Sequence, residues 1–383
     1  MRGMLRSCQV LMAALIMVGC AGSNRERAGG RLIIAGGGTS AENEEVYSKF
    51  MEKLPPDGVI GVLPTASGVA VESAASAVKT LTRYAGGRHV NIIDITSQTS
   101  QRASDPEFVD EIKACRALWF TGGDQSRIVA AFRPAAGDTP GYHAARAVLD
   151  GGGVIGGTSA GAAMMSDPMI TGGRSDDALL GKSKAAGDDS GFGTAKGMGF
   201  FPYGLTDQHF LRRGRLGRLV AALELTGLKR GFGIEENCAL CVDIADHTAT
   251  VLGPVPAMVL VDISNVQRDG PARRGVRVSL LNDGDRVDGL SGIVQPEAKR
   301  KSAAPGASPQ PGELPEAWAA GAITVAFRKL AANPKGPVEL HSPAFSVTLS
   351  ADDRTGFYSD PAAPDRITVL NARLDIVPAP AKP

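Results

Sequence analysis

The sequence contains only five cysteines among its 383 residues, and this scarcity limits the chemistry that the chain can support. Cys8 and Cys20 lie in the first segment, which leaves Cys115, Cys238 and Cys241. An odd number in an exported chain gives no basis for a disulfide framework. Cys238 and Cys241 form a CxxC pair, but one pair cannot fill a tetrahedral zinc site, so we interpret both as strand cysteines. No other cluster has the spacing of metal ligands, and we expect neither a metal nor another cofactor.

Long runs of charged or apolar residues are also missing. The formal net charge is +1, and no basic tract carries interleaved aromatic residues, which argues against a nucleic-acid partner. The apolar run from Val10 to Val18 is too short to span a bilayer comfortably. It follows a basic start and ends at Gly19-Cys20, as an export signal does.

The end of this signal resembles the bacterial lipoprotein box, in which the cysteine is lipidated and becomes the first residue. We therefore expect residues 1–30 to be a signal peptide and tether, with lipid on Cys20. The protein would then be exported and held at a bacterial membrane, either in the periplasm or at the cell surface. The alternatives are an ordinary signal peptide and an uncleaved anchor, in which Cys20 has no role.

The segment after this leader has an α/β rhythm. Short apolar segments at 31–35, 59–63, 90–95, 117–120 and 154–155 predict strands, and helical spacing at 69–85, 105–114, 124–132 and 139–149 predicts helices. This alternation predicts a mostly parallel sheet with helices on both faces, in a catalytic domain over residues 31–295. The active site of such a sheet lies beyond the carboxyl ends of its strands.

The pattern changes toward the C-terminus. Residues 296–315 are rich in Lys, Ala, Pro and Ser and predict a linker. Alternating apolar residues at 323–327, 345–349 and 367–376 predict strands of a small β-rich appendage over residues 316–383. The sequence assigns no role to this appendage.

The most informative motif is Gly157-Thr158-Ser159-Ala160-Gly161, a GxSxG pattern between a predicted strand and a helical stretch. Small flanking residues allow a serine to sit on a sharp turn with its hydroxyl exposed, where it can act as a nucleophile. The alternative is a glycine-rich turn in which Ser159 only caps the helix. The strand-turn-helix context favours the nucleophile.

A second glycine-containing loop, Thr121-Gly122-Gly123-Asp124-Gln125, also follows a predicted strand. The backbone N–H of Gly123 can supply half of an oxyanion hole, with the N–H of Ala160 as the other half. The alternative is an ordinary β-α turn with Asp124 as the helix cap. A third loop, Gly36-Gly37-Gly38, is not GxGxxG and has no acidic ribose partner at the expected distance, which argues against nucleotide binding.

His209 is the best candidate for a general base among the five histidines, because polar residues and an arginine cluster surround it. It follows Asp207-Gln208 and precedes Arg212, Arg213, Arg215 and Arg218. Arg212, Arg215 and Arg218 recur at helical spacing and could share one face, whereas Arg213 would point elsewhere. The alternative is a solvated basic helix.

A pair of carboxylates, Glu235 and Glu236, follows a strand that starts near Gly231. A carboxylate in this position could orient the histidine and stabilise its cation. Adjacent residues of an extended chain project oppositely, so only one of the two can face His209. The alternative is a surface turn.

Taken in order along residues 31 to 292, these four motifs resemble the cyanophycinases, of the serine peptidase family that also contains the aspartyl dipeptidases. The resemblance implies a fold like that of the class I glutamine amidotransferases and a triad of Ser159, His209 and Glu236. It also implies a substrate site shaped by Gln125, Asp207, Gln208, Arg213, Arg215 and Arg218. Glu235 stands where an aspartate would be expected, and the chain after about residue 296 departs from the pattern.

The substrate that this resemblance implies is cyanophycin, a poly-aspartate chain with an arginine on each side chain, which would be cleaved to β-aspartyl-arginine dipeptides. Arginines in the pocket suit the free arginyl carboxylate, because a guanidinium pairs with it bidentately. Two alternatives remain, an aspartyl dipeptidase or related exopeptidase and a non-enzymatic surface lipoprotein that binds the polymer. The sequence is compatible with a homodimer.

Overall fold

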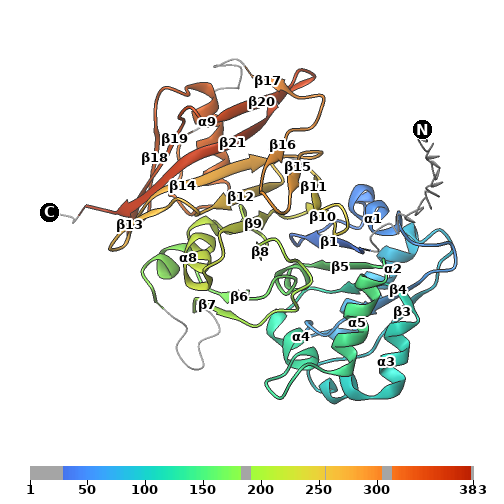
Figure 1. Ribbon diagram of the computed structural model, residues 1–383. Coiled ribbons are helices and arrows are strands. Elements are labelled where there is room, and N and C mark those ends of the chain that lie inside the picture. Colours follow the sequence, from blue (N-terminus) through green and yellow to red (C-terminus); the bar gives the residue numbers. More distant parts are fainter. Residues whose placement is uncertain (1–28, 183–190, 255, 304–312, 381–383) are drawn as a thin grey trace, which may run out of the picture.

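The computed structural model describes residues 29–182, 191–254, 256–303 and 313–380, and these form a mixed α/β protein with two large sheets (Figure 1). The expected signal peptide and lipidation site at Cys20 lie outside the described residues. None of the helices in the described ranges is long and apolar enough to cross a membrane.

The first sheet has nine strands in the order β16-β15-β11-β10-β1-β5-β4-β2-β3. Its strands are β1 (Arg31–Ala35), β2 (Val59–Leu63), β3 (Val90–Ile92), β4 (Cys115–Phe120), β5 (Val154–Thr158), β10 (Ala239–Asp243), β11 (Thr248–Leu252), β15 (Arg286–Asp288) and β16 (Val294–Gln295). The strands β1, β5, β4, β2 and β3 pair in parallel. The other four add to the edge at β1 in antiparallel pairs.

The prediction of a mostly parallel sheet therefore describes only the half that precedes residue 159, and the whole sheet is mixed. The reason is the short connection between β10 and β11, which spans residues 244–247. A connection of this length permits only a hairpin, and hairpin strands are antiparallel. The α/β rhythm upstream carries no information about this later segment.

Helices cover both faces of the parallel half, as its alternating pattern indicates (Figure 1). They are α1 (Glu44–Met51), α2 (Ala70–Tyr84), α3 (Pro106–Lys113), α4 (Gln125–Phe132) and α5 (Pro140–Asp150). Successive residues of β1 point to opposite sides of the sheet. Leu32 and Ile34 pack in the core under α3, α4 and α5, whereas Ile33 and Ala35 pack in the core under α1 and α2.

The second sheet has ten strands, seven of which follow the order β17-β20-β21-β14-β12-β9-β8. These are β8 (Leu205–Asp207), β9 (Arg230–Ile234), β12 (Met258–Asp262), β14 (Ala272–Leu281), β17 (Lys301–Ser302), β20 (Gly356–Asp360) and β21 (Ala363–Pro378). The others are β13 (Gln267–Asp269), which pairs with β14, β19 (Phe345–Ser350), which pairs with β21, and β18 (Val338–His341), which pairs with β19. Two helices, α8 (Leu216–Thr226) and α9 (Ala322–Ala332), share one hydrophobic core with this sheet.

The C-terminal segment is part of this second sheet rather than a separate layer. Strand β21 pairs with β14 across the expected linker, with Val278 opposite Ala372 and Leu280 opposite Val369 (Figure 1). The strands of the second sheet therefore pair across the domain boundary that the sequence predicted at residue 295. Composition can reveal a linker at 296–315, but it cannot show that the strand after the linker returns to pair with the strand before it.

The segment 323–327, expected to be a strand, lies in helix α9 instead. The buried residues of this helix recur with helical periodicity, as the pairs Ala322-Ile323, Ala326-Phe327 and Leu330-Ala331 show. Five residues of apolar alternation are too few to reveal this period, and the prediction stopped before Leu330.

Candidate active site

Ser159 sits on a sharp turn between β5 and the short helix α6 (Ala160–Ala163). Its backbone has φ 53° and ψ −109°, a conformation that non-glycine residues rarely adopt. The flanking glycines make the turn feasible, because a Cβ on Gly157 would lie 2.4 Å from the carbonyl oxygen of Gly161. A Cβ on Gly161 would lie 2.3 Å from the carbonyl oxygen of Phe120. The GxSxG spacing thus reflects close backbone packing around the serine.

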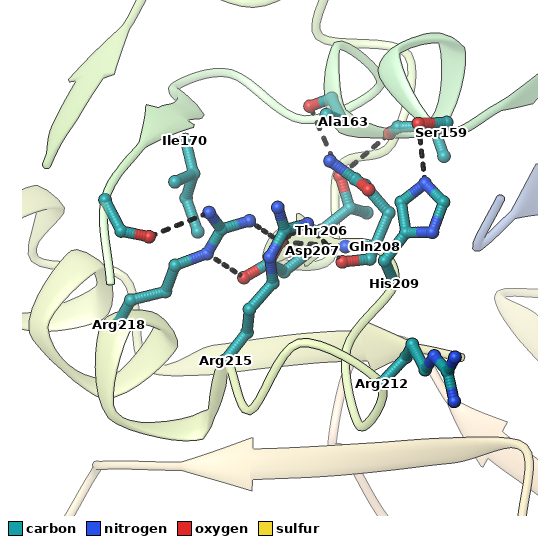
Figure 2. A network of polar contacts seen from close by, with 12 residues as sticks. Ser159, Ala163, Ile170, Thr206, Asp207, Gln208, His209, Arg212, Arg215 and Arg218 are labelled. Carbon is teal, nitrogen blue, oxygen red and sulfur yellow. Dashed lines mark hydrogen bonds and ion pairs between the residues drawn. The ribbon is translucent and has the colours of Figure 1, made fainter. Parts of the chain in front are cut away.

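His209 follows β8 and contacts both Ser159 and Glu236. Its Nε2 is hydrogen-bonded to Ser159 Oγ (Figure 2), at a distance of 2.9 Å, and its Nδ1 lies 2.6 Å from Glu236 Oε1. A serine hydroxyl, an imidazole and a carboxylate in a hydrogen-bonded series have the geometry of a serine-hydrolase triad. The structure therefore brings together the three residues that the sequence proposes for this role.

Three chain segments hold this series in place. The N–H of His209 donates to the carbonyl of Gly36 at 2.7 Å, and the N–H of Asn237 donates to the carbonyl of Gly37 at 2.8 Å. The side chain of Asn237 in turn accepts from the N–H of Ser40 at 2.9 Å. The loop after β1 thereby connects the loop that carries His209 to the loop that carries Glu236.

The two adjacent glutamates do point in different directions. Glu236 faces His209, whereas Glu235 Oε2 accepts hydrogen bonds from the N–H groups of Leu211 (2.5 Å) and Arg212 (3.0 Å). Burial raises the pKa of Glu235, and these N–H donors oppose that rise. Glu235 therefore fixes the loop that follows His209 and does not touch the imidazole itself.

The surroundings of His209 favour the neutral imidazole. Burial is the largest cause that lowers the pKa of His209, and the charges of Arg213 and Arg215 lower it further. The hydrogen bond and charge of Glu236 act in the opposite direction. Because the net pKa is below the usual value of 6.5, His209 is neutral at pH 7 and able to accept a proton.

A cavity of about 360 Å³ opens beside Ser159 and His209. Its lining includes Gly38, Thr39, Tyr47, Ser73, Ser76, Thr80, Trp119, Thr121, Gly122 and Thr158. The hydroxyl of Thr121 is buried and has no hydrogen-bond partner within the described residues, and an unsatisfied buried hydroxyl is costly.

The loop of the predicted oxyanion hole lies against the serine. A Cβ on Gly122 would be 3.4 Å from the Cβ of Ser159 and 3.9 Å from its Oγ, whereas one on Gly123 would meet the carbonyl of Ala66 at 2.0 Å. Gly122 thus allows this loop to approach Ser159, and Gly123 allows it to approach the backbone of Ala66. Asp124 caps helix α4 through its side chain, as the alternative interpretation of this loop expected.

Four of the predicted substrate residues are engaged elsewhere in the protein. Gln125 is buried and donates to the carbonyl of Ile170 at 2.8 Å. Asp207 forms a buried, two-pronged ion pair with Arg218, and Arg215 lies beside it (Figure 2). Arg215 also donates to the carbonyl of Gln208. Asp207, Arg215 and Arg218 support the loop around His209. Within the described residues, none of the four side chains lines the cavity beside Ser159.

Gln208, Arg213 and Arg212 occupy three different environments. Gln208 is buried, and its side-chain oxygen has no partner within the described ranges. Arg213 is exposed and lines a second pocket together with Arg215. Arg212 points away from the network (Figure 2). The helical spacing of Arg212, Arg215 and Arg218 therefore does not produce a shared face, because α8 begins only at Leu216.

The cysteines and other metal-ligating residues form no centre in the described part of the chain. No group of three or more His, Cys, Asp or Glu side chains there could hold a metal ion. Cys241 lies in β10 and Cys238 directly before it, and both are buried. Burial raises the pKa of both thiols, that of Cys241 to about 11, which disfavours the reactive thiolate.

The sequence analysis missed several residues of the site, foremost the glycine loop after β1. A Cβ on Gly37 would lie 2.3 Å from Nε2 of His209, so this glycine provides the surface on which the imidazole rests. The sequence signal for this loop is the run Gly36-Gly37-Gly38 directly after a strand, which the sequence analysis interprets only in terms of nucleotide binding. Nothing in the sequence pattern marks Tyr47 or Trp119 as part of the lining of the cavity beside Ser159.

The fold and this site define a serine-type peptidase. The profile of peptidase family S51 matches residues 32–251, more than half of the chain, and the chain belongs to this family. A cyanophycinase from Synechococcus elongatus is 30% identical over 265 residues, which cover 66% of this chain and 77% of the relative. A cyanophycinase from Geminocystis herdmanii is 28% identical over 278 residues, which cover 69% of this chain and 97% of the relative.

A similar solved structure is that of a peptidase from an acI-B1 Actinobacterium, with 18% sequence identity and a TM-score of 0.47. The match covers 70% of this chain and 95% of the other.

Proposed function

We propose that the protein hydrolyses cyanophycin to β-aspartyl-arginine dipeptides through an acyl-enzyme on Ser159. The observation that carries the proposal is the hydrogen-bonded series Ser159-His209-Glu236 at the edge of an open cavity. The choice of substrate is supported by the likeness to curated cyanophycinases. The arrangement of five parallel strands with the nucleophile directly after β5 supports a fold like that of the class I glutamine amidotransferases.

The first half of the reaction forms the acyl-enzyme. His209 Nε2 takes the proton of Ser159 Oγ as this oxygen attacks the scissile carbonyl carbon. The carbonyl oxygen becomes an anion, and in this proposal the N–H groups of Gly123 and Ala160 stabilise it. Glu236 holds the Nδ1–H tautomer of His209 and stabilises the imidazolium. The imidazolium then protonates the leaving amine, and the C–N bond breaks.

The second half releases the enzyme. A water molecule gives a proton to His209 Nε2 and attacks the acyl carbon, and the imidazolium returns the proton to Ser159 Oγ as the ester bond breaks. Water and the amide substrate thus supply all atoms of the two products. The protein residues, water and substrate account for every proton transfer in these steps, so the proposal includes no metal or other cofactor.

We further propose that Cys20 is lipidated and that the enzyme acts from a bacterial membrane on polymer outside the cytoplasm. This part rests on the sequence of the leader, with its basic start, short apolar run and terminal cysteine.

The deciding experiment incubates the purified protein with cyanophycin and identifies the products by mass analysis. The proposal expects β-aspartyl-arginine as the main product, and no product from the Ser159→Ala variant. Cleavage of small aspartyl dipeptides without action on cyanophycin would instead identify an aspartyl dipeptidase. Binding of cyanophycin without any turnover would favour a polymer-binding lipoprotein.

A further inference from the structure

A second pocket of about 560 Å³ lies beside the loop that carries His209. One wall consists of Arg213, Gly214 and Arg215 from this loop and of Arg174 and Asp177 from the start of α7 (Ser175–Leu179). The other wall consists of Glu316, Trp318 and Pro343. These three residues lie outside the range that matches the peptidase family, so this wall is a property of the C-terminal segment.

The C-terminal wall is fixed to the rest of the site by specific contacts. Trp318 Nε1 donates to Asp176 at 2.5 Å, and the hydroxyl of Ser342 donates to the same carboxylate at 2.8 Å. A Cβ on Gly214 would lie 1.8 Å from the carbonyl oxygen of Trp318, so the two backbones touch. The wall is thus built against the catalytic loop and is not a flap resting on the surface.

The pocket offers charges of both signs. Arg174 and Arg213 are exposed and form no ion pair within the described ranges, and the exposed carboxylate of Glu316 faces the same space from the other wall. Asp176, in contrast, is occupied by Trp318 and Ser342. A ligand that suits this arrangement carries a carboxylate for the arginines and a cation for Glu316.

An arginyl group with a free carboxylate has this combination of charges. Its carboxylate can pair with the guanidinium groups of Arg174 and Arg213, and its own guanidinium can pair with Glu316. The half-buried indole of Trp318 provides an aromatic face on which a guanidinium can stack. A branched polymer of aspartate and arginine presents such a group on every unit.

We propose that this pocket is a second substrate-binding site, in which the C-terminal segment holds the arginyl group of a third unit, next to the two units that flank the scissile bond. This inference rests on the proposed function and extends it to the part of the chain beyond residue 296. The backbone supports the adjacency, because the N–H of Arg213 donates to the carbonyl of His209 at 3.0 Å. The charges of Arg213 and Arg215 also reach His209, whose pKa they lower.

The test measures how strongly oligomers of two and three β-aspartyl-arginine units bind to the Ser159→Ala protein, which cannot cleave them. An additional unit in the second site should make the three-unit oligomer bind about tenfold more tightly than the two-unit oligomer, the gain that one good ion pair with stacking provides. Glu316→Gln and Arg174→Gln, added singly, should each reduce this preference by at least about threefold. Both residues are exposed, so neither change should affect folding.

The matched control is Glu339→Gln, which removes an exposed carboxylate of the same C-terminal segment outside the pocket. It should leave the length preference unchanged. Equal binding of the two oligomers, or a preference that Glu316→Gln and Arg174→Gln leave intact, would overturn the second site. Cleavage of cyanophycin by the unmodified protein is measured in parallel, because its absence would overturn the proposed function even where the length preference is found.

Discussion

The imidazole of His209 rests directly on the backbone of Gly37, with no room for a side chain between them. A Cβ on Gly37 would lie 2.3 Å from both Nε2 and Cε1 of the ring. The same ring atom, Nε2, lies 2.9 Å from Ser159 Oγ. The position of the general base therefore depends on the absence of a side chain in a loop more than 170 residues away in sequence.

We predict that Gly37→Ala displaces the imidazole and lowers kcat by at least about a hundredfold, since misplacement of a catalytic group by about 1 Å has this effect. The control is Gly87→Ala. Both glycines have positive φ values, 103° and 87°, but nothing lies within 4 Å of a Cβ on Gly87. Gly87→Ala should therefore share the backbone strain and retain activity. Equal kcat values for the two variants would show that the contact with His209 is unimportant.

We predict that substitutions of the triad residues and of Glu235 reduce kcat by different amounts. Ser159→Ala should remove nearly all activity, about five to six orders of magnitude in kcat, and Glu236→Gln should cost about four orders. Glu235→Gln should be mild, because an amide oxygen can still accept from Leu211 and Arg212. Steady-state rates on cyanophycin, with circular dichroism to verify folding, measure these effects. If Glu235→Gln were the more damaging of the two glutamate changes, the assignment of Glu236 would fail.

Local sequence patterns predicted those features of the site that depend on local structure. The elbow at Ser159 follows from a strand and small neighbours. Glu235 and Glu236 point in different directions as expected, although they follow the end of β9 and Glu236 lies in a turn rather than on an extended chain. Features that depend on distant pairing were not predictable. The Asp207-Arg218 ion pair required the position of α8 against β8, and no spacing rule indicates that Gly37 lies under His209.

The fold was likewise predictable where it depends on local sequence and not where it depends on the pairing of distant segments. The bounds of β1 and β2 agree with the segments expected at 31–35 and 59–63, because short apolar runs between turn residues mark strands locally. The pairing of β14 with β21 joins residues about a hundred apart, and the composition of the intervening linker gives no sign of it. The arginines illustrate the consequence, since the spacing of Arg212, Arg215 and Arg218 suggested one shared face but the fold leaves Arg212 exposed and buries Arg218.

The pH dependence of the reaction should reflect the pKa of His209. Because burial and nearby arginines lower the pKa of His209, kcat/KM should be constant at neutral pH and fall only on the acid side, as the pH drops through that lowered pKa. Arg213→Gln removes a charge that disfavours the imidazolium, so the pKa of His209 should rise and the acid limb should move to higher pH. Arg212→Gln is the control, because Arg212 points away from the network (Figure 2). An acid limb that does not move in Arg213→Gln would contradict this electrostatic account.

The proposed lipidation of Cys20 leads to a prediction about localisation. Cys20→Ser should release the protein from the membrane fraction of its native host, because it removes the residue that would carry the lipid. Fractionation after expression of the parent and the variant, with metabolic labelling by a radioactive fatty acid, measures this. Cys115→Ser is a suitable control, since Cys115 is buried in the first sheet. Label that remains on the Cys20→Ser protein would place the lipid elsewhere.

The last prediction concerns Arg213 and Arg218, two arginines of the cluster that follows His209. Arg218 is 4% exposed and pairs with Asp207, which is 1% exposed, so Arg218→Gln leaves a buried carboxylate without its partner. Breaking a buried pair in this way typically costs about 3–5 kcal/mol, and the free energy of unfolding should fall by a similar amount. Arg213 is exposed and has no ion pair in the described part of the chain, so Arg213→Gln should change stability by less than about 0.5 kcal/mol.

The two variants should also affect different kinetic parameters. Arg213→Gln should raise KM for cyanophycin by about tenfold, because it removes one guanidinium from the second pocket. A factor of ten corresponds to the loss of a charge-assisted pair of about 1.4 kcal/mol. Arg218→Gln should lower kcat at temperatures where the variant stays folded, because the loop before His209 loses its support from Asp207. Denaturant unfolding and steady-state kinetics on the same preparations measure both. A normal KM in Arg213→Gln together with normal stability in Arg218→Gln would leave the arginine cluster without the roles assigned to it, while the Ser159-His209-Glu236 site would be unaffected.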